Sequence, residues 1–124
     1  MAIHSDHKIL IADEDDLDKQ RLIRLLGRLP CQIIDSITVS NLVDFADQHK
    51  PDLIILEIYT RDRIGIKTVI ELKSRFPSIP VIVLSGMESS LLKISEDMGA
   101  DIVLPKHKNL SYTGLLNYIK EFFD

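Results

Sequence analysis

The stretch PDLIILEIYTRDRIG, residues 51–65, contains the most apolar run of the sequence and ends that run on a carboxylate. Residues 53–56 (LIIL) show no alternation of apolar and polar side chains, as expected for a strand buried on both faces. Glu57 follows directly. A buried charge is costly unless it is paired or bound to a ligand. The stretch therefore predicts a central strand and a partner for the Glu57 carboxylate.

Four other apolar runs flank this strand in the sequence, with helical patterns between them. The predicted strands are 8–12, 31–39, 53–56, 81–85 and 101–105, and the predicted helices are 16–29, 40–49, about 64–75, 88–98 and 111–123. The second strand is more polar than the others, which favours a place at the edge of the sheet. Alternating strands and helices are typical of parallel sheets joined by right-handed crossovers. The sequence therefore predicts a (βα)₅ domain of the α/β class.

Several residues mark where the predicted helices begin and end. Pro30 is expected to stop the helix at 16–29, because proline cannot continue it. Ser40 or Asn41 would suit the N-cap of the next helix. Gly99 is expected to close the fourth helix in a C-cap role.

The composition indicates a single domain over residues 1–124, of which 1–7 form a polar leader. A net charge of −4 does not indicate a basic surface that would bind nucleic acid. No apolar segment approaches the ~20 residues needed to cross a bilayer, and the N-terminus lacks the layout of a secretion signal. We therefore expect a cytoplasmic protein. The single cysteine, Cys31, excludes an internal disulfide and is expected to serve packing.

Polar side chains follow the predicted strands at the point where each strand ends. Asp13, Glu14 and Asp15 follow the first strand, Glu57 the third and Ser85 the fourth; the fifth runs into Lys106, which completes the set. The carboxyl ends of parallel strands meet at one edge of the sheet, where α/β proteins place their sites. Each element also has a structural explanation, such as acidic residues favoured at a helix N-terminus or turn chemistry at Ser85.

Their joint placement predicts a site for a cation and a phosphoryl group. Clustered carboxylates repel one another, and Mg²⁺ binds oxygen ligands, commonly one or two carboxylates with water and phosphate. A lysine beside them suits a phosphoryl or carboxylate group as a point charge.

Four motifs in order and spacing resemble those of the response-regulator receiver domain, the phosphorylated signalling module of two-component systems. They are ILIADED (9–15), PDLIILE (51–57), VIVLSG (81–86) and MGADIVLPK (98–106), with Gly65 in the loop after the third strand. The resemblance covers essentially the whole chain. It implies a flavodoxin-like three-layer sandwich whose five parallel strands have the order 2-1-3-4-5.

The resemblance also implies roles for individual residues. Asp13 and Glu14 would hold Mg²⁺, with the backbone carbonyl of Tyr59 as a further ligand. Ser85 would contact the phosphoryl group, and Lys106 would pair with position 57.

The sequence departs from the family pattern at the phospho-acceptor, where the family has aspartate and this chain has Glu57. The longer side chain moves its carboxylate roughly 1.5 Å, one C–C bond, further into the pocket. Arg61 and His107 stand where the family usually has proline, and Val103 replaces the aromatic residue that couples to Ser85. These departures resemble the atypical, or pseudo-receiver, branch of the family.

We therefore expect a receiver of a two-component or phosphorelay system that is not phosphorylated in the usual way and is not an enzyme. A Glu57–Lys106 ion pair would satisfy the buried charge without phosphate. The domain would then act by binding protein: a histidine kinase, an output domain or a downstream regulator. The fourth helix, fifth strand and fifth helix would form the binding face, with Tyr112, Tyr118, Phe122 and Phe123 lying there. A homodimer is left open; binding to nucleic acid or membrane is not expected.

Two other functions remain open at this point. The first is a conventional receiver that is phosphorylated on Glu57 or on a neighbour such as Asp62. The second is a small magnesium phosphohydrolase of the haloacid-dehalogenase type, with Asp13 and Asp15 as nucleophile and acid/base. A flavodoxin-like nucleotide binder is disfavoured because no glycine-rich phosphate loop follows the first strand.

Overall fold

Strands and helices alternate along the chain in a computed structural model that describes residues 3–58, 63–85, 96–105 and 112–123. The elements are β1 (Lys8–Ala12), α1 (Asp16–Leu26), β2 (Gln32–Asp35), the 3₁₀ helix η1 (Val39–Asn41), α2 (Leu42–His49), β3 (Leu53–Ile58), α3 (Arg63–Arg75), β4 (Val81–Ser85), β5 (Ile102–Pro105) and α5 (Tyr112–Phe123). Most of the predicted helix at 88–98 lies outside the described residues.

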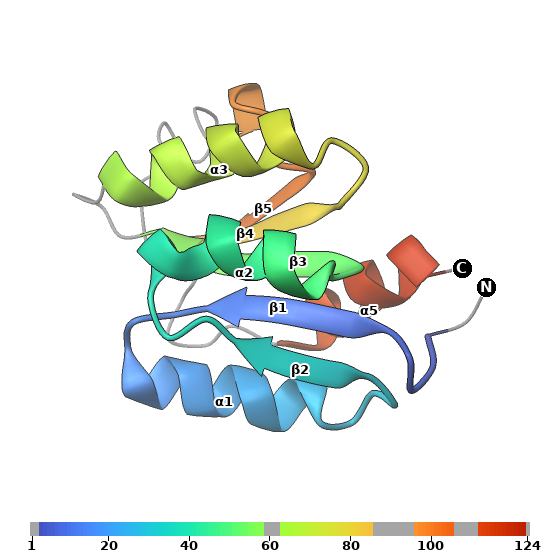
Figure 1. Ribbon diagram of the computed structural model, residues 1–124. Coiled ribbons are helices and arrows are strands. Elements are labelled where there is room, and N and C mark those ends of the chain that lie inside the picture. The colour runs from blue at the N-terminus through green and yellow to red at the C-terminus, as the bar shows by residue number, and fades with distance from the viewer. Residues whose placement is uncertain (1–2, 59–62, 86–95, 106–111, 124) are drawn as a thin grey trace.

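The five strands form one parallel sheet with the order β2-β1-β3-β4-β5. This order confirms the prediction. The carboxyl ends of the strands point to the left in Figure 1, whereas both chain termini lie on the right. All six residues of β3 are buried, as its central place requires.

The sheet is covered by helices on both faces. Val39, α2 and α3 pack on one face, against side chains such as Leu10, Ile54 and Val83. The helices α1 and α5 pack on the other face, against side chains such as Ile9, Ile55 and Ile82. Successive side chains of a strand point to opposite faces, so the unbroken apolar runs of the sequence supply both cores at once.

The second strand ends four residues earlier than predicted. β2 stops at Asp35, because the backbone turns at Ile37, where φ is 73°. The N–H of Thr38 donates to the carbonyl of Ser36 across this turn at 2.8 Å. A three-residue turn with a central φ near +75° is the rare, strained form of the γ-turn. The β-branched run Ile37–Thr38–Val39 favours a strand locally, and tertiary contacts override that preference.

The helix ends follow the sequence signals in part. α1 ends at Leu26, and i→i+3 hydrogen bonds carry the chain as far as Leu29, just before Pro30. Asn41 occupies the N-cap position of α2, but its side chain donates to the carbonyl of Ser36 at 3.2 Å instead of capping the helix. Gly99 has a φ of 102°, a left-handed value that glycine adopts at little cost.

Within the described residues, no helix combines the length and the apolar character that a membrane span needs.

Candidate functional site

Three of the predicted site residues lie buried at the carboxyl edge of the sheet. Asp13 follows β1, Glu57 is the penultimate residue of β3 and Ser85 ends β4; their exposures are 1%, 3% and 0%. The strand register aligns these ends, since Ala12 pairs with Leu56 and Ile58 pairs with Ser85. The convergence expected from the sequence is therefore present for these three residues.

The alternation of strand side chains explains which face the acidic residues occupy. Glu57 comes two residues after Ile55, whose side chain belongs to the core beneath α1 and α5. Asp13 comes two residues after Ile11, which belongs to the same core. Both carboxylates are thus directed to the side on which α1 begins.

A third carboxylate, that of Asp18 on α1, joins them. One carboxylate oxygen from each of Asp13, Asp18 and Glu57 lies within 4.8 Å of the other two. Asp18 also lies 4.0 Å from Arg21, measured from Oδ1 to Nη1. This grouping of three carboxylates could hold a divalent cation, because oxygen ligands of this kind suit Mg²⁺.

The start of α1 brings Asp18 to this place. The Asp13 carboxylate accepts a hydrogen bond from the N–H of Asp15 at 3.0 Å. Asp15 is the N-cap of α1, and its own carboxylate accepts from the N–H of Asp18 at 3.0 Å. Asp18 therefore lies in the first turn of α1, next to the strand end. Sequence reasoning did not assign it to the site, although its position three residues after a capping aspartate was a usable signal.

Glu14, predicted as a metal ligand, is exposed and is not part of this group of described carboxylates. Its Oε1 accepts a hydrogen bond of 3.4 Å from the N–H of Val39 at the start of η1. Asp15 is likewise engaged as a helix cap. The structure thus groups Asp13 with Asp18, and the role of Glu14 at a metal site stays a prediction.

Ser85 and Val103 lie on neighbouring strands. The Ser85 hydroxyl donates to the carbonyl of Ile58 at 3.2 Å, which connects the ends of β4 and β3. Val103 is half-buried and packs against the core beneath α2 and α3. Its register partner on β4 is Val83, two residues before Ser85.

Three predicted residues lie outside the described part of the chain: Tyr59, Asp62 and Lys106. Their assigned roles stay predictions. Residues 88–95 and 111, which belong to the predicted binding face, lie outside it too.

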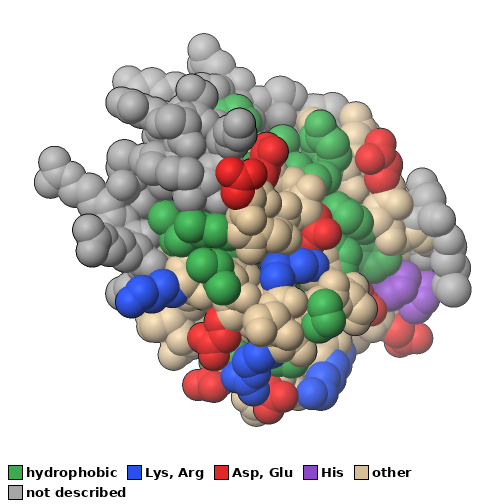
Figure 2. Space-filling view, turned by 90° about the horizontal axis from the view of Figure 1, so that it is seen from above, with side chains coloured by type: hydrophobic (Ala, Val, Ile, Leu, Met, Phe, Trp, Pro, Cys, Tyr) green, Lys and Arg blue, Asp and Glu red, His purple; other side chains and the backbone are tan. Residues whose placement is uncertain are grey.

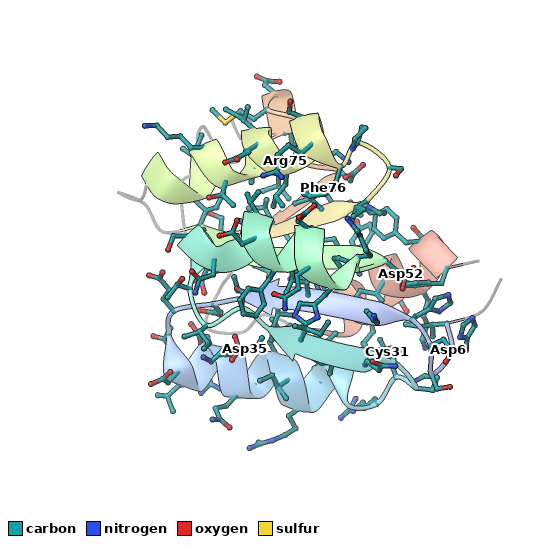
Figure 3. All side chains as sticks on the ribbon, viewed as in Figure 1. Asp6, Cys31, Asp35, Asp52, Arg75 and Phe76 are labelled. Carbon is teal, nitrogen blue, oxygen red and sulfur yellow. The ribbon has the colours of Figure 1, made fainter. Side chains whose placement is uncertain are left out.

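Cys31 directly precedes β2, at the end of that strand away from the site (Figure 3). It is half-buried and packs against the core beneath α1 and α5, in keeping with a packing role. Burial raises the pKa of the Cys31 thiol, whereas a backbone hydrogen bond lowers it by less. Figure 3 shows Cys31 and Asp35 at opposite ends of β2, with Asp35 toward the site edge.

Residues 9–114 match the family described as the response regulator receiver domain. The transcriptional regulatory protein PdtaR of Mycobacterium tuberculosis is 28% identical over 106 residues, which make up 84% of this chain and 51% of that protein. The chain thus spans about half the length of the curated relatives that it matches.

Solved structures share the fold over nearly the whole chain. A LuxR family DNA-binding response regulator from Silicibacter pomeroyi is 25% identical, with a TM-score of 0.78 over 94% of this chain and 91% of that chain. The signal receiver domain of a DNA-binding response regulator (merR) from Colwellia psychrerythraea 34H is 24% identical, with a TM-score of 0.83 over 95% of this chain and 98% of that chain. With the buried acidic residues at the carboxyl edge of a sheet of order 2-1-3-4-5, these matches show that the chain belongs to the response regulator receiver domains of two-component signalling.

Proposed function

We propose that this receiver domain is not phosphorylated in the usual way and acts as a protein-binding module. One observation carries the proposal: a glutamate, Glu57, stands buried at the acceptor position at the end of the central strand, beside Asp13 and Asp18. Asp13 and Ser85 are buried at the same edge of the sheet.

The extra methylene group of Glu57 works against phosphoryl transfer. It moves the carboxylate by about 1.5 Å relative to an aspartate on the same backbone. Attack on a phosphodonor needs the reacting atoms in line, and a misplacement of ~1 Å can cost around a hundredfold in rate. The residues that flank Glu57 in β3, Leu56 and Ile58, are fully buried. The backbone therefore has little freedom to move and offset the displacement of the carboxylate.

Lys106 would supply the counter-charge for Glu57. The register supports this pairing, since β4 and β5 align Ser85 with Pro105, the residue just before Lys106. Such a buried pair contributes little net stability, but removing one partner is costly because it leaves an uncompensated charge. The pair would hold the pocket in one state without phosphate.

Mg²⁺ fits the donors that the structure brings together. Receiver domains bind Mg²⁺ through acidic residues, and Asp13, Asp18 and Glu57 present three carboxylate oxygens within 4.8 Å of one another. We propose Asp13 as a ligand, with the Tyr59 carbonyl and Glu14 or Asp18 completing the protein's share. When bound, Mg²⁺ would balance the carboxylate charge and bind phosphate oxygens.

The partner would be a histidine kinase, an output domain or a downstream regulator, bound by the surface that includes β5 and α5. Within the described part of α5, Tyr118 is exposed, whereas Ile119 and Phe123 are buried in the core. Tyr118 is therefore available to a partner, and Phe123 serves packing. The relatives named above are regulatory proteins, and we propose a cytoplasmic signalling role for this chain too.

The test is phosphorylation of the natural protein beside the Glu57→Asp variant, each incubated with Mg²⁺ and acetyl phosphate and read by intact mass. We expect the variant alone to gain a phosphoryl group, because only aspartate places the nucleophile correctly. Samples with EDTA in place of Mg²⁺ should remain unmodified. An Asp13→Asn change in the Glu57→Asp background should also block the gain.

Modification of the natural protein would contradict the proposal. Peptide mapping would then show whether Glu57 or Asp62 accepts the phosphoryl group. Catalytic turnover of a phosphate ester by the natural protein would contradict it in a different way and favour a phosphohydrolase.

A further inference from the structure

Two carboxylates are candidates for the place beside Asp13 at the carboxyl edge of the sheet. The resemblance to receiver domains assigns that place to Glu14, the next residue along the chain. The structure instead brings Asp18 there, from the first turn of α1. The two candidates differ in the face of the sheet to which they are directed, in their burial and in their hydrogen bonds.

Glu14 is directed to the face of the sheet opposite to that of Asp13. Its Oε1 accepts a hydrogen bond of 3.4 Å from the N–H of Val39, and Val39 packs in the core beneath α2 and α3. Asp13 and Glu57 are directed to the other face, which α1 covers. To join them, the exposed side chain of Glu14 would have to leave η1 and cross the end of β1.

Asp18 lies on the same side of the sheet as the two buried carboxylates. One of its carboxylate oxygens lies within 4.8 Å of an oxygen of Asp13 and of an oxygen of Glu57. Two oxygens bound to one Mg²⁺ at about 2.1 Å can be at most about 4.2 Å apart. A shift of roughly 0.6 Å, within the reach of a small side-chain rotation, therefore brings all three oxygens into the range of a single ion.

Two contacts fix the rotation of α1 that directs Asp18 to this place. The N–H of Asp18 donates to the carboxylate of Asp15, the N-cap, at 3.0 Å. The next residue, Lys19, forms a partly buried ion pair of 3.1 Å with Asp35 at the end of β2. Neighbouring residues of a helix point about 100° apart. With Lys19 turned toward β2, Asp18 is turned toward the ends of β1 and β3.

The helix dipole by itself does not account for the position of the Asp18 side chain. An acidic residue in the first turn of a helix is favourable whichever way it points. Asp16 stands in the same turn, and its side chain is 92% exposed. Only 27% of the Asp18 side chain is exposed, and it lies beside two other carboxylates. That position becomes favourable when a cation binds among the three groups.

Carboxylates on the other side of the sheet are arranged differently. Acidic and basic side chains are interspersed there (Figure 2), with Arg75 3.7 Å from Glu71. This exposed pair has the i, i+4 spacing of a helix, so α3 alone explains it. Among the described residues, a group of three carboxylates that could hold a metal ion is found at Asp13, Asp18 and Glu57 alone.

We propose that Asp18, and not Glu14, is the second carboxylate ligand of the cation site, with Asp13 as the first. The inference rests on the proposed function only in taking Mg²⁺ as a ligand of this domain. It departs from the family pattern, because the second carboxylate comes from a helix and not from the residue next to Asp13. Cation binding then connects the first turn of α1 to the ends of β1 and β3.

Metal binding in the absence of any phosphodonor tests the inference. Mn²⁺ is the probe, because it favours the same oxygen ligands as Mg²⁺ and its free ion is counted by electron paramagnetic resonance. Asp18→Asn should raise the dissociation constant at least about tenfold, since it removes a coordinating charge. Glu14→Gln should raise it less than about threefold, as expected for an exposed charge near the site. Competition by Mg²⁺ would verify that both ions occupy one place.

Asp16→Asn is the matched control. It removes the same charge from the same turn of α1, but from a side chain that faces solvent. The dissociation constant for Mn²⁺ should therefore change less than about threefold. Glu71→Gln on α3 repeats the control at a distance from the site. Circular dichroism would verify that all four variants fold.

Amide chemical shifts give a second readout that does not depend on affinity. In the natural protein, Mg²⁺ should shift the signals of Asp13, Asp18 and Lys19, because the ion contacts both the strand end and the helix. In Asp18→Asn, saturating Mg²⁺ should leave the Lys19 signal nearly unchanged while Asp13 still responds.

Three results would overturn the inference. They are absence of Mn²⁺ binding to the natural protein at millimolar concentration, a loss in Glu14→Gln that equals or exceeds the loss in Asp18→Asn, and an equal loss in Asp16→Asn. None of these depends on whether Glu57 accepts phosphate, which intact mass decides. Failure of Asp18 as a ligand and failure of the proposed function would therefore be told apart.

Discussion

Strand register, burial and charge all act on one residue of the site, Glu57. It is 3% exposed, and its neighbours in space include the carboxylates of Asp13 and Asp18. Carboxylates this close repel one another, so a cation beside them, either an ammonium group or a divalent ion, would be favoured. The extra methylene group of Glu57 would therefore affect the binding of both a metal ion and a phosphoryl group.

Ile37 offers a second test at the scale of one residue. It combines a φ of 73° with 62% exposure, so its side chain contributes little burial to offset its backbone strain. A left-handed conformation costs a β-branched residue ~1–2 kcal/mol, and glycine avoids that cost but loses ~0.5–1 kcal/mol in entropy. We expect Ile37→Gly to raise the free energy of unfolding by about 0.5–1 kcal/mol, measured by urea denaturation.

Ile37→Val is the control, because it keeps the branched Cβ and hence the strain. Its free energy of unfolding should stay within about 0.5 kcal/mol of the natural protein. A loss of stability in Ile37→Gly would show that the isoleucine side chain contributes more than its conformation costs. The surrounding hydrogen bonds hold the turn in either case, since Asp35 accepts from the N–H of Ile37 at 2.8 Å.

At the scale of elements, the approach of α3 to β3 depends on a glycine. Gly65 is the third residue of α3, and a Cβ there would lie 2.9 Å from Cγ1 of Ile58, the last residue of β3. Ile58 is fully buried and adjoins Glu57, so it has little room to move. The close approach holds the start of α3 against the strand end that presents Glu57.

Two glycine substitutions test this contact. Gly65→Ala should lower the free energy of unfolding by about 1–3 kcal/mol, because the added methyl group overpacks the α3–β3 contact. Gly114→Ala in α5 should raise it by about 0.5–1 kcal/mol, since nothing lies within 4 Å of the added carbon and alanine favours the helix. Thermal and urea unfolding would measure both. Equal effects of the two substitutions would rule out a steric role for Gly65.

For the whole molecule, one sheet is shared by two cores. Leu72 of α3 belongs to the core on one face, and Leu26 of α1 belongs to the core on the other. The strands between them contribute alternate residues to each core, so neither face can lose its packing without loosening the sheet. The domain is therefore expected to unfold as one unit.

Leu26→Ala and Leu72→Ala test this cooperativity. Both side chains are fully buried, and each truncation should cost about 2–5 kcal/mol. We expect a single unfolding transition in both variants, with coincident midpoints by circular dichroism and tyrosine fluorescence. A two-step curve in either variant would show that one helical layer unfolds independently.

The sequence was sufficient for much of the fold. The strands at 8–12 and 81–85 were predicted with the bounds that the structure shows, because each is a compact apolar run with clear polar limits. The motifs also placed Asp13, Glu57 and Ser85 at one edge, since parallel strands must end together. The end of β2 was predicted wrongly, because the turn after Asp35 depends on a hydrogen bond from Ser36 Oγ to the Ile11 carbonyl, a contact between residues far apart in sequence.

By itself, then, the sequence determined the alternation of strands and helices, the family and the unusual glutamate, because these follow from side-chain periodicity and local motifs. Only the tertiary structure decided that Asp18 meets Asp13 and Glu57, and that the side of the helix with Arg21, Arg24 and Arg28 faces solvent. Packing and register set such meetings, because they join side chains from separate elements or orient a helix toward solvent. A local pattern of residues does not by itself determine which elements pack together or which side of a helix faces solvent.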